Sequence, residues 1–117
     1  MTKTKTFEIK SNLRIERWKT GSPVTQEEAE AILHREGYES FCWYDVPGAH
    51  YRKHRHGCDE CLWILKGEMH FESGDEIYKL KDGDRIYFPA GALHSVEVPL
   101  ETSVTYLVGQ KPAKADK

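Results

Sequence analysis

The sequence predicts a single all-β domain that carries one short helix near its N-terminus. From residue 39 onward, turn signals recur about every 8 to 12 residues and separate apolar stretches of strand length, which is the spacing of a β-sandwich or barrel. The segment before residue 38 instead combines helix start and stop signals. With 117 residues, the chain has the length of one domain and can bury a sizeable core.

The composition is that of a soluble globular domain, with 31% charged and 38% hydrophobic residues. A net charge of -2 gives no support for binding to nucleic acid. The N-terminal seven residues lack the apolar core of a secretory signal, and no apolar run approaches the ~20 residues that span a membrane. The three cysteines are odd in number, which fits reduced thiols. We therefore expect a cytoplasmic protein without nucleic-acid or membrane partners.

The N-terminal residues are expected to fray and then to enter a strand near Phe7 and Ile9. Residues 13–18 alternate well enough for a second strand, with Leu13 and Ile15 on one face. The Gly-Ser-Pro sequence that starts at residue 21 then ends this strand.

Helix signals follow directly. Thr25 is expected to cap the helix at its N-terminus, Glu28 completes a capping box, and Gly37 marks a left-handed stop. One stripe of this helix is apolar and comprises Ala29, Ile32 and Leu33. We expect the stripe to pack on the outside of a barrel, with Tyr38 folding back toward it.

The barrel itself is predicted from residues 39–110, with residues 1–38 as an extension packed on it and residues 111–117 as a disordered tail. Turns are expected at Gly67-Glu68 and at Pro89-Ala-Gly91, among others. The expected strands cover residues 40–45, 51–56, 61–65, 69–72, 77–80, 85–88, 94–98 and 103–108.

The strand at 61–65 is apolar on both faces. Leu62 and Ile64 share the parity of Glu60 and should line the interior, whereas Trp63 and Leu65 point outward. A strand that is apolar on both faces needs cover on both. The helix can cover part of the outer face and a second subunit the rest, so we expect a homodimer.

Two histidines and a carboxylate cluster just before this strand. His54 and His56 leave an extended backbone on the same face, and a short turn brings Glu60 back toward the same point. Imidazole nitrogens together with a carboxylate suit a divalent transition metal better than Mg²⁺ or Ca²⁺. A solvated, histidine-rich loop is the alternative interpretation.

Two motifs extend this pattern. The stretch from Gly48 to Gly67 reads G-x5-H-x-H-x3-E-x6-G, and the stretch from Gly83 to Val98 reads G-x5-P-x-G-x2-H-x3-V. In this order they resemble the two signature motifs of the cupin superfamily, which has Asn at the position of Val98. Since that Asn is not among the family's metal ligands, the departure concerns a local strand contact.

The resemblance implies a jelly-roll β-barrel with a metal site near one mouth. It also implies one divalent transition-metal ion per chain, Fe, Mn, Ni or Zn, and barrel-mediated dimers are common in the superfamily. The implied ligands are His54, His56, Glu60 and His94. Such a set would leave two positions of an octahedral ion open to water or substrate.

Three further sets of residues have more than one possible role. Cys58 and Cys61 have the spacing of a zinc half-site and could form a structural site with the two motif histidines. Arg52 shares the parity of His54, so it is a candidate for holding a substrate carboxylate or phosphate, or else a surface arginine. His50 is a candidate proton shuttle or a residue that merely lines the mouth.

Two function classes follow. The first is a metal-dependent enzyme of dioxygenase, isomerase or decarboxylase type acting on a small polar or anionic molecule, as the resemblance implies. The second is a non-catalytic module that binds or senses a small ligand. We favour the enzyme, because the chain shows no DNA-binding helix pair or second domain to relay a signal.

Overall fold

The computed structural model of the protein describes residues 4–10, 13–19 and 21–113, with side chains described from residue 13 onward. Within these residues the chain forms nine strands, all paired antiparallel, and one helix. The elements are β1 (Thr4–Lys10), β2 (Leu13–Trp18), α1 (Gln26–Arg35), β3 (Glu39–Asp45), β4 (His50–His54), β5 (Cys58–Ser73), β6 (Glu76–Lys81), β7 (Arg85–Phe88), β8 (His94–Glu97) and β9 (Val104–Pro112).

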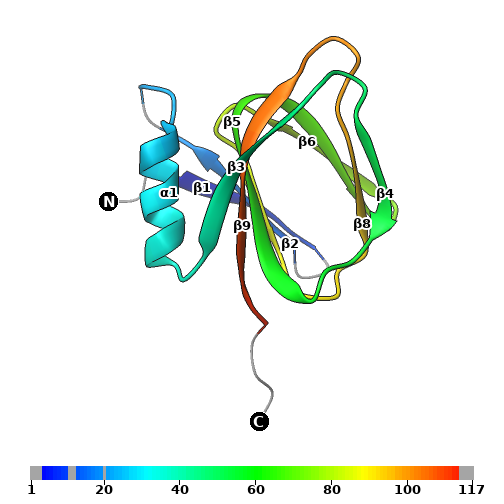
Figure 1. The fold of residues 1–117 in the computed structure, drawn as a ribbon, viewed down its shortest axis with the longest axis horizontal. Helices are drawn as coiled ribbons and strands as arrows, with labels where there is room; N and C mark the ends of the chain where they lie inside the picture. The colour runs from blue at the N-terminus through cyan, green and yellow to red at the C-terminus, as the bar shows by residue number, and fades with distance from the viewer. Residues whose placement is uncertain (1–3, 11–12, 20, 114–117) are drawn as a thin grey trace.

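The strands form two layers that share β5. One layer runs in the order β1-β2-β7-β5-β9-β3, and the other in the order β4-β8-β5-β6. Figure 1 shows these layers curling into a barrel, with α1 outside it and next to β3. The all-β jelly-roll architecture with one short helix is confirmed.

A single strand, β5, replaces the two expected strands and the turn between them. Its first part pairs with β7 and β9, and its last part pairs with β6 and β8. The register shifts between Ile64 and Lys66, and Gly67 has a positive φ of 110°. A bulge of this kind bends a strand from one sheet into the next without ending it. The prediction of a turn at Gly67-Glu68 is therefore wrong.

The barrel interior holds the main core. Leu62, Ile64, Met69 and Phe71 point inward from β5, as the parity argument requires of the first two. Val98 is fully buried in the same core, and its N–H donates to the Ala49 carbonyl at 2.8 Å. The departure from Asn at this position thus adds an apolar side chain to the core.

Helix α1 has both of the ends that its sequence predicts. Thr25 and Glu28 form the reciprocal capping box. At the other end Gly37 has a φ of 95°, and the Tyr38 N–H donates to the Leu33 carbonyl at 2.9 Å, as in a Schellman motif. No helix in the described part of the chain is long and apolar enough to cross a membrane.

A second apolar cluster fills the space between α1 and the outer face of the sheet. Trp63 is fully buried there, beside Ala29 and Leu33 of the helix, and Leu65 packs against the same cluster. This cluster covers the apolar outer face of β5 without a second subunit. Exposure of Trp63 and Leu65 is therefore not a reason for dimerisation, and the homodimer stays a prediction that needs another basis.

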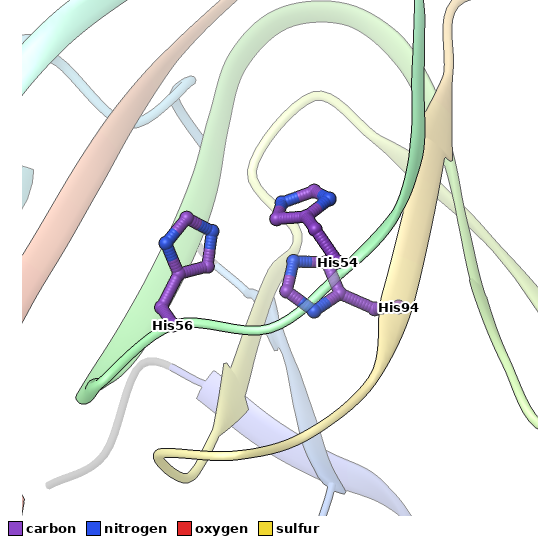
Figure 2. A group of neighbouring side chains, drawn as sticks. All are labelled: His54, His56 and His94. Carbon is purple, nitrogen blue, oxygen red and sulfur yellow. The ribbon is translucent and has the colours of Figure 1, made fainter.

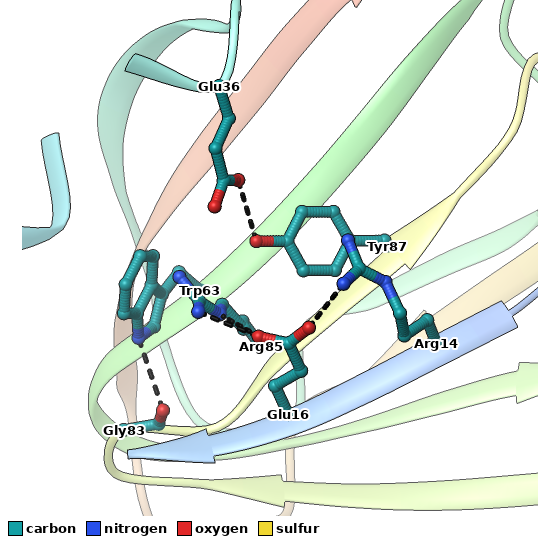
Figure 3. A network of polar contacts seen from close by, with 7 residues as sticks. All are labelled: Arg14, Glu16, Glu36, Trp63, Gly83, Arg85 and Tyr87. Atoms are coloured by element: carbon teal, nitrogen blue, oxygen red, sulfur yellow. Dashed lines mark hydrogen bonds and ion pairs between the residues drawn. The ribbon is translucent and has the colours of Figure 1, made fainter. Parts of the chain in front are cut away.

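A polar network joins β2 to the barrel (Figure 3). The Arg85 guanidinium donates to Glu16 Oε1 at 2.7 Å, lies 4.0 Å from the Trp63 ring centroid, and belongs to β7. Arg14 also donates to Glu16. Since β2 pairs with β7 as well, the extension at residues 1–38 contributes strands to the barrel's own sheet.

The C-terminal segment continues the sheet for longer than expected. Lys111 and Pro112 are the last residues of β9, and Lys111 Nζ donates to the Glu36 carbonyl at 3.1 Å. The expectation of disorder is wrong for these two residues. Residues 114–117, which the same expectation covered, lie outside the described residues.

Candidate metal centre

Three imidazoles converge inside the barrel. His54 is the last residue of β4, His56 lies in the following loop, and His94 is the first residue of β8. Figure 2 shows the three rings gathered around one space. One ligand atom from each lies within 4.8 Å of the others, and the ring centroids are 4.4, 4.6 and 5.5 Å apart.

This arrangement fits a transition-metal ion. An ion about 2.1 Å from each nitrogen keeps the nitrogens within about 4.2 Å of one another, so small side-chain rotations suffice. In addition, the His54 Nδ1 lies 2.6 Å from the Arg52 carbonyl, and the His94 Nδ1 lies 3.0 Å from the Ala92 carbonyl. Because a carbonyl only accepts, each Nδ1 carries the proton and each Nε2 is left free as a ligand atom.

His94 is held between two phenylalanines. Its ring stacks on Phe71, with centroids 5.0 Å apart and planes 9° apart, and lies 4.6 Å from the Phe88 ring. Only 3% of His94 is exposed. This burial lowers the pKa of His94 to about 4, aided by the neighbouring His54 and His56. A neutral imidazole is the form that binds a metal ion.

Backbone contacts between the two motifs place His94 beside His56. The Gly91 N–H donates to the His56 carbonyl at 2.9 Å. The Ala90 N–H donates to Asp59 Oδ1 at 2.8 Å. The turn that precedes His94 is thereby fixed to the loop that carries His56 and to the start of β5. These contacts explain why His56 and His94, which are far apart in the sequence, lie in one site.

Glu60 is buried next to the three histidines, but the group whose ligand atoms all lie within 4.8 Å does not include it. Its Oε2 accepts from Gln110 Nε2 at 2.8 Å and lies 3.6 Å from His56 Nδ1. Through Oε2 the carboxylate is thus held between Gln110 and His56. The structure thus places Glu60 at the edge of the site.

Gln110 is a site residue that sequence reasoning missed. It lies outside both motifs, and an isolated glutamine near the end of a chain carries no chemical signal. Its position follows from the register of β5 and β9, in which Glu60 and Gln110 are direct cross-strand partners. A correct strand pairing is the one signal that could have identified it.

Arg52 and His50 are not brought to the site. The pairing of β4 with β8 shifts between Tyr51 and His54, so β4 contains an extra residue. This bulge reverses the alternation, and Tyr51 lines the cavity while Arg52 is exposed and does not. His50 lines a small separate depression with Glu97. Of the two interpretations of Arg52, the structure therefore supports the surface arginine, and the expected strand ends at His54 instead of continuing to His56.

The cysteines do not join the histidines. Cys61 is fully buried in the outer cluster beside Trp63, and burial raises the pKa of its thiol. Cys58 has its Sγ 3.9 Å from Glu60 Oε2. Because Cys61 lies on the opposite face of β5 from Glu60, the structure does not support the structural zinc alternative.

A cavity of about 240 Å³ opens onto the histidines. Its lining residues are Phe41, Trp43, Tyr51, His54, His56, Glu60, Leu62, Met69, His94, Val96, Tyr106, Val108 and Gln110. Of these, Phe41, Trp43 and Tyr51 are between 39% and 48% exposed, so the entrance lies at β3 and β4. The Gly91 hydrogen bond to the His56 carbonyl joins the loop after β4 to the turn at residues 89–91.

Solved structures with this fold are numerous. A cupin protein from Bacteroides fragilis superposes with a TM-score of 0.60 at 17% identity, over 100% of this chain and 91% of that one. An RmlC-like cupin from Shewanella frigidimarina gives 0.58 at 18% identity, over 97% and 87%. A predicted oxalate decarboxylase from Thermotoga maritima gives 0.58 at 20% identity, over 93% and 91%. At these identities the likeness concerns the fold.

A search of curated proteins gave no significant match. The sequence model of the cupin domain, in contrast, matches residues 43–109, which is more than half of the chain. The matched segment contains all three histidines of the cluster together with β4 to β8, the strands that form most of the barrel. This chain therefore belongs to the cupin family.

Proposed function

We propose that the protein is a metal-dependent enzyme whose ion is held by His54, His56, His94 and Glu60. The observation that carries the proposal is the convergence of three imidazoles at the inner end of an open cavity. Structural metal sites are closed by protein ligands, whereas catalytic sites leave positions for water or substrate. The proposed ion is a single divalent transition metal such as Fe, Mn, Ni or Zn.

Three of the four proposed ligands are oriented by hydrogen bonds. The carbonyls of Arg52 and Ala92 orient two imidazoles, and Gln110 holds the Glu60 carboxylate. The bound ion would supply Lewis acidity toward a substrate oxygen. The chain's own part is to fix the ligands, to exclude bulk water with the aromatic wall, and to keep the cavity open at β3 and β4.

A dioxygenase, isomerase or decarboxylase reaction is compatible with this arrangement, and a non-catalytic ligand-binding module is the second candidate. The second is favoured by one observation: besides the proposed ligands, few cavity residues carry a group that could transfer protons. A cytoplasmic location is part of the same proposal and is supported by three free thiols, Cys42, Cys58 and Cys61.

Elemental analysis of the purified protein tests the metal centre. We expect about one transition-metal ion per chain, and loss of most of it in His54→Ala and in His94→Ala, because each removes one of four ligands. The control is His70→Ala, which removes an imidazole outside the cluster. Undiminished metal in both ligand variants, with loss in Cys58→Ser, would reinstate the structural zinc site.

A thermal-shift screen of small oxygen-donor compounds against the metallated and metal-free protein tests the open positions. We expect at least one compound to stabilise the metallated form selectively. Conversion of that compound to a product would indicate an enzyme, whereas binding without conversion would indicate a ligand-binding module. If no compound shifts the metallated form selectively, the enzyme proposal fails.

A further inference from the structure

We infer that the cavity takes a ring-bearing ligand with an oxygen donor at one end and no charged group elsewhere. This inference rests on the proposed function, because the donor end is placed at the proposed ion. It replaces the anionic substrate that an inward-pointing Arg52 would have favoured.

Among the described residues, the lining of the cavity contains no lysine or arginine. Its apolar members come from four strands, β3, β5, β8 and β9: Phe41, Trp43, Leu62, Met69, Val96 and Val108. A carboxylate or phosphate pressed against this wall would lose its hydration without gaining a partner, which is unfavourable. Charge is therefore tolerated only at the ion itself.

The two tyrosines of the wall present their rings and not their hydroxyls. The Tyr51 hydroxyl donates to Asp45 Oδ1 at 2.6 Å, and the Tyr106 hydroxyl donates to Asp45 Oδ2 at 2.7 Å. Asp45 is 93% buried, so this pair of hydrogen bonds satisfies both carboxylate oxygens away from water. Both hydroxyls are thereby engaged, and the amide of Gln110 is engaged by Glu60 in the same way.

The entrance is aromatic. Phe41 and Trp43 lie edge to face with ring centroids 6.0 Å apart, and they are 45% and 48% exposed. Such geometry favours a further ring at the exposed faces. The cavity volume of about 240 Å³ exceeds the roughly 150 Å³ that holds benzene in an engineered apolar cavity, which leaves room for a short donor group.

A matched pair of chelators separates the contribution of the ring to the binding affinity from that of the oxygen donors. Benzohydroxamic acid and acetohydroxamic acid bind metals through the same two oxygens and differ by a phenyl against a methyl group. Titration calorimetry on Co²⁺-loaded protein should show benzohydroxamic acid binding at least about tenfold more tightly, because its ring buries more apolar surface. Oxalate, which chelates without a ring, should bind more weakly than benzohydroxamic acid.

Substitutions of single residues show which side chain causes the preference for the phenyl compound. Trp43→Ala should reduce the preference for the phenyl compound about tenfold and leave the affinity for acetohydroxamic acid unchanged. Tyr44→Ala is the matched control, since Tyr44 is the next residue of β3, is 58% exposed and does not line the cavity. Arg52→Ala should leave the affinity for oxalate unchanged.

The outcomes distinguish the two claims. If both hydroxamates bind equally, if oxalate binds more tightly, or if Trp43→Ala leaves the preference intact, the inference about the ligand is overturned and the metal centre stands. If the protein holds no Co²⁺, or if neither hydroxamate changes the visible spectrum of bound Co²⁺, the proposed function is overturned and the inference with it.

Discussion

Gln110 illustrates how one side chain outside both motifs can control a ligand. Its amide nitrogen lies 2.8 Å from Glu60 Oε2, the carboxylate oxygen that also lies 3.6 Å from His56 Nδ1, so it holds the carboxylate beside the imidazoles. In other metal sites, removal of a residue that holds a ligand in this way lowers the metal affinity about 10–100-fold. Gln110 is thus expected to act through Glu60 and not through contact with the ion.

Replacement of Gln110 by leucine tests this role. Gln110→Leu keeps the side-chain volume and removes the donor, so we expect metal affinity to fall about 10–100-fold in competition titrations with a chelator. Thr105→Val is the control, because Thr105 lies on the same strand and does not line the cavity. An unchanged affinity would mean that Glu60 either needs no support or does not bind the ion.

At the scale of the element, β5 joins the two layers of the barrel through its bend at Gly67. A Cβ at this position would lie 2.1 Å from the Ser103 carbonyl oxygen, well inside van der Waals contact, and the φ of 110° is unfavourable for any other residue. Gly67 N–H also donates to Asp82 at 2.7 Å. The bend therefore depends on glycine for two separate reasons.

Comparison of two glycines separates these reasons. Gly74 also has a positive φ, 61°, but a Cβ there would meet nothing within 4 Å. We expect Gly74→Ala to cost about 1–2 kcal/mol of the free energy of unfolding, the cost of the backbone conformation alone. Gly67→Ala should cost more than about 3 kcal/mol, because the backbone of β9 must also move. Urea unfolding measures both, and similar losses in the two variants would contradict the role of close packing.

At the scale of the whole molecule, the open edge of the barrel is the feature that bears on assembly. Within the described residues β3 pairs only with β9, so its other edge is unpaired. Exposed apolar side chains accompany this edge, including Tyr44 at 58% and Val46 at 57%. Unpaired edges with apolar side chains favour pairing with another chain. This surface replaces Trp63 and Leu65 as the basis for the expected homodimer.

Light scattering tests that expectation. We expect a mass of twice the 13.5 kDa of one chain at micromolar concentration. Tyr44→Lys should shift the equilibrium toward the monomer, since a lysine on an edge strand opposes pairing. A wild-type mass near 13.5 kDa would rule out the dimer.

The sequence by itself determined the features that depend on neighbours along the chain. The caps of α1 require residues three or four apart, and the alternation of a strand is equally local, so Thr25, Gly37, His54 and His56 could all be assigned from their spacing. The family resemblance added the ligand set, and the structure brings its three histidines together.

The tertiary structure alone decided the features that depend on cross-strand pairing. The extra residue in β4 places Tyr51, and not Arg52, in the wall of the cavity. The bend at Gly67 joins two expected strands into one, and the register of β9 brings Gln110 to Glu60. Because strand alternation has a period of two, one unpaired residue reverses which side chains face the interior. The bulge that causes this reversal is stabilised by β8, which lies some forty residues away along the chain, so inspection of residues 50–56 could not reveal it.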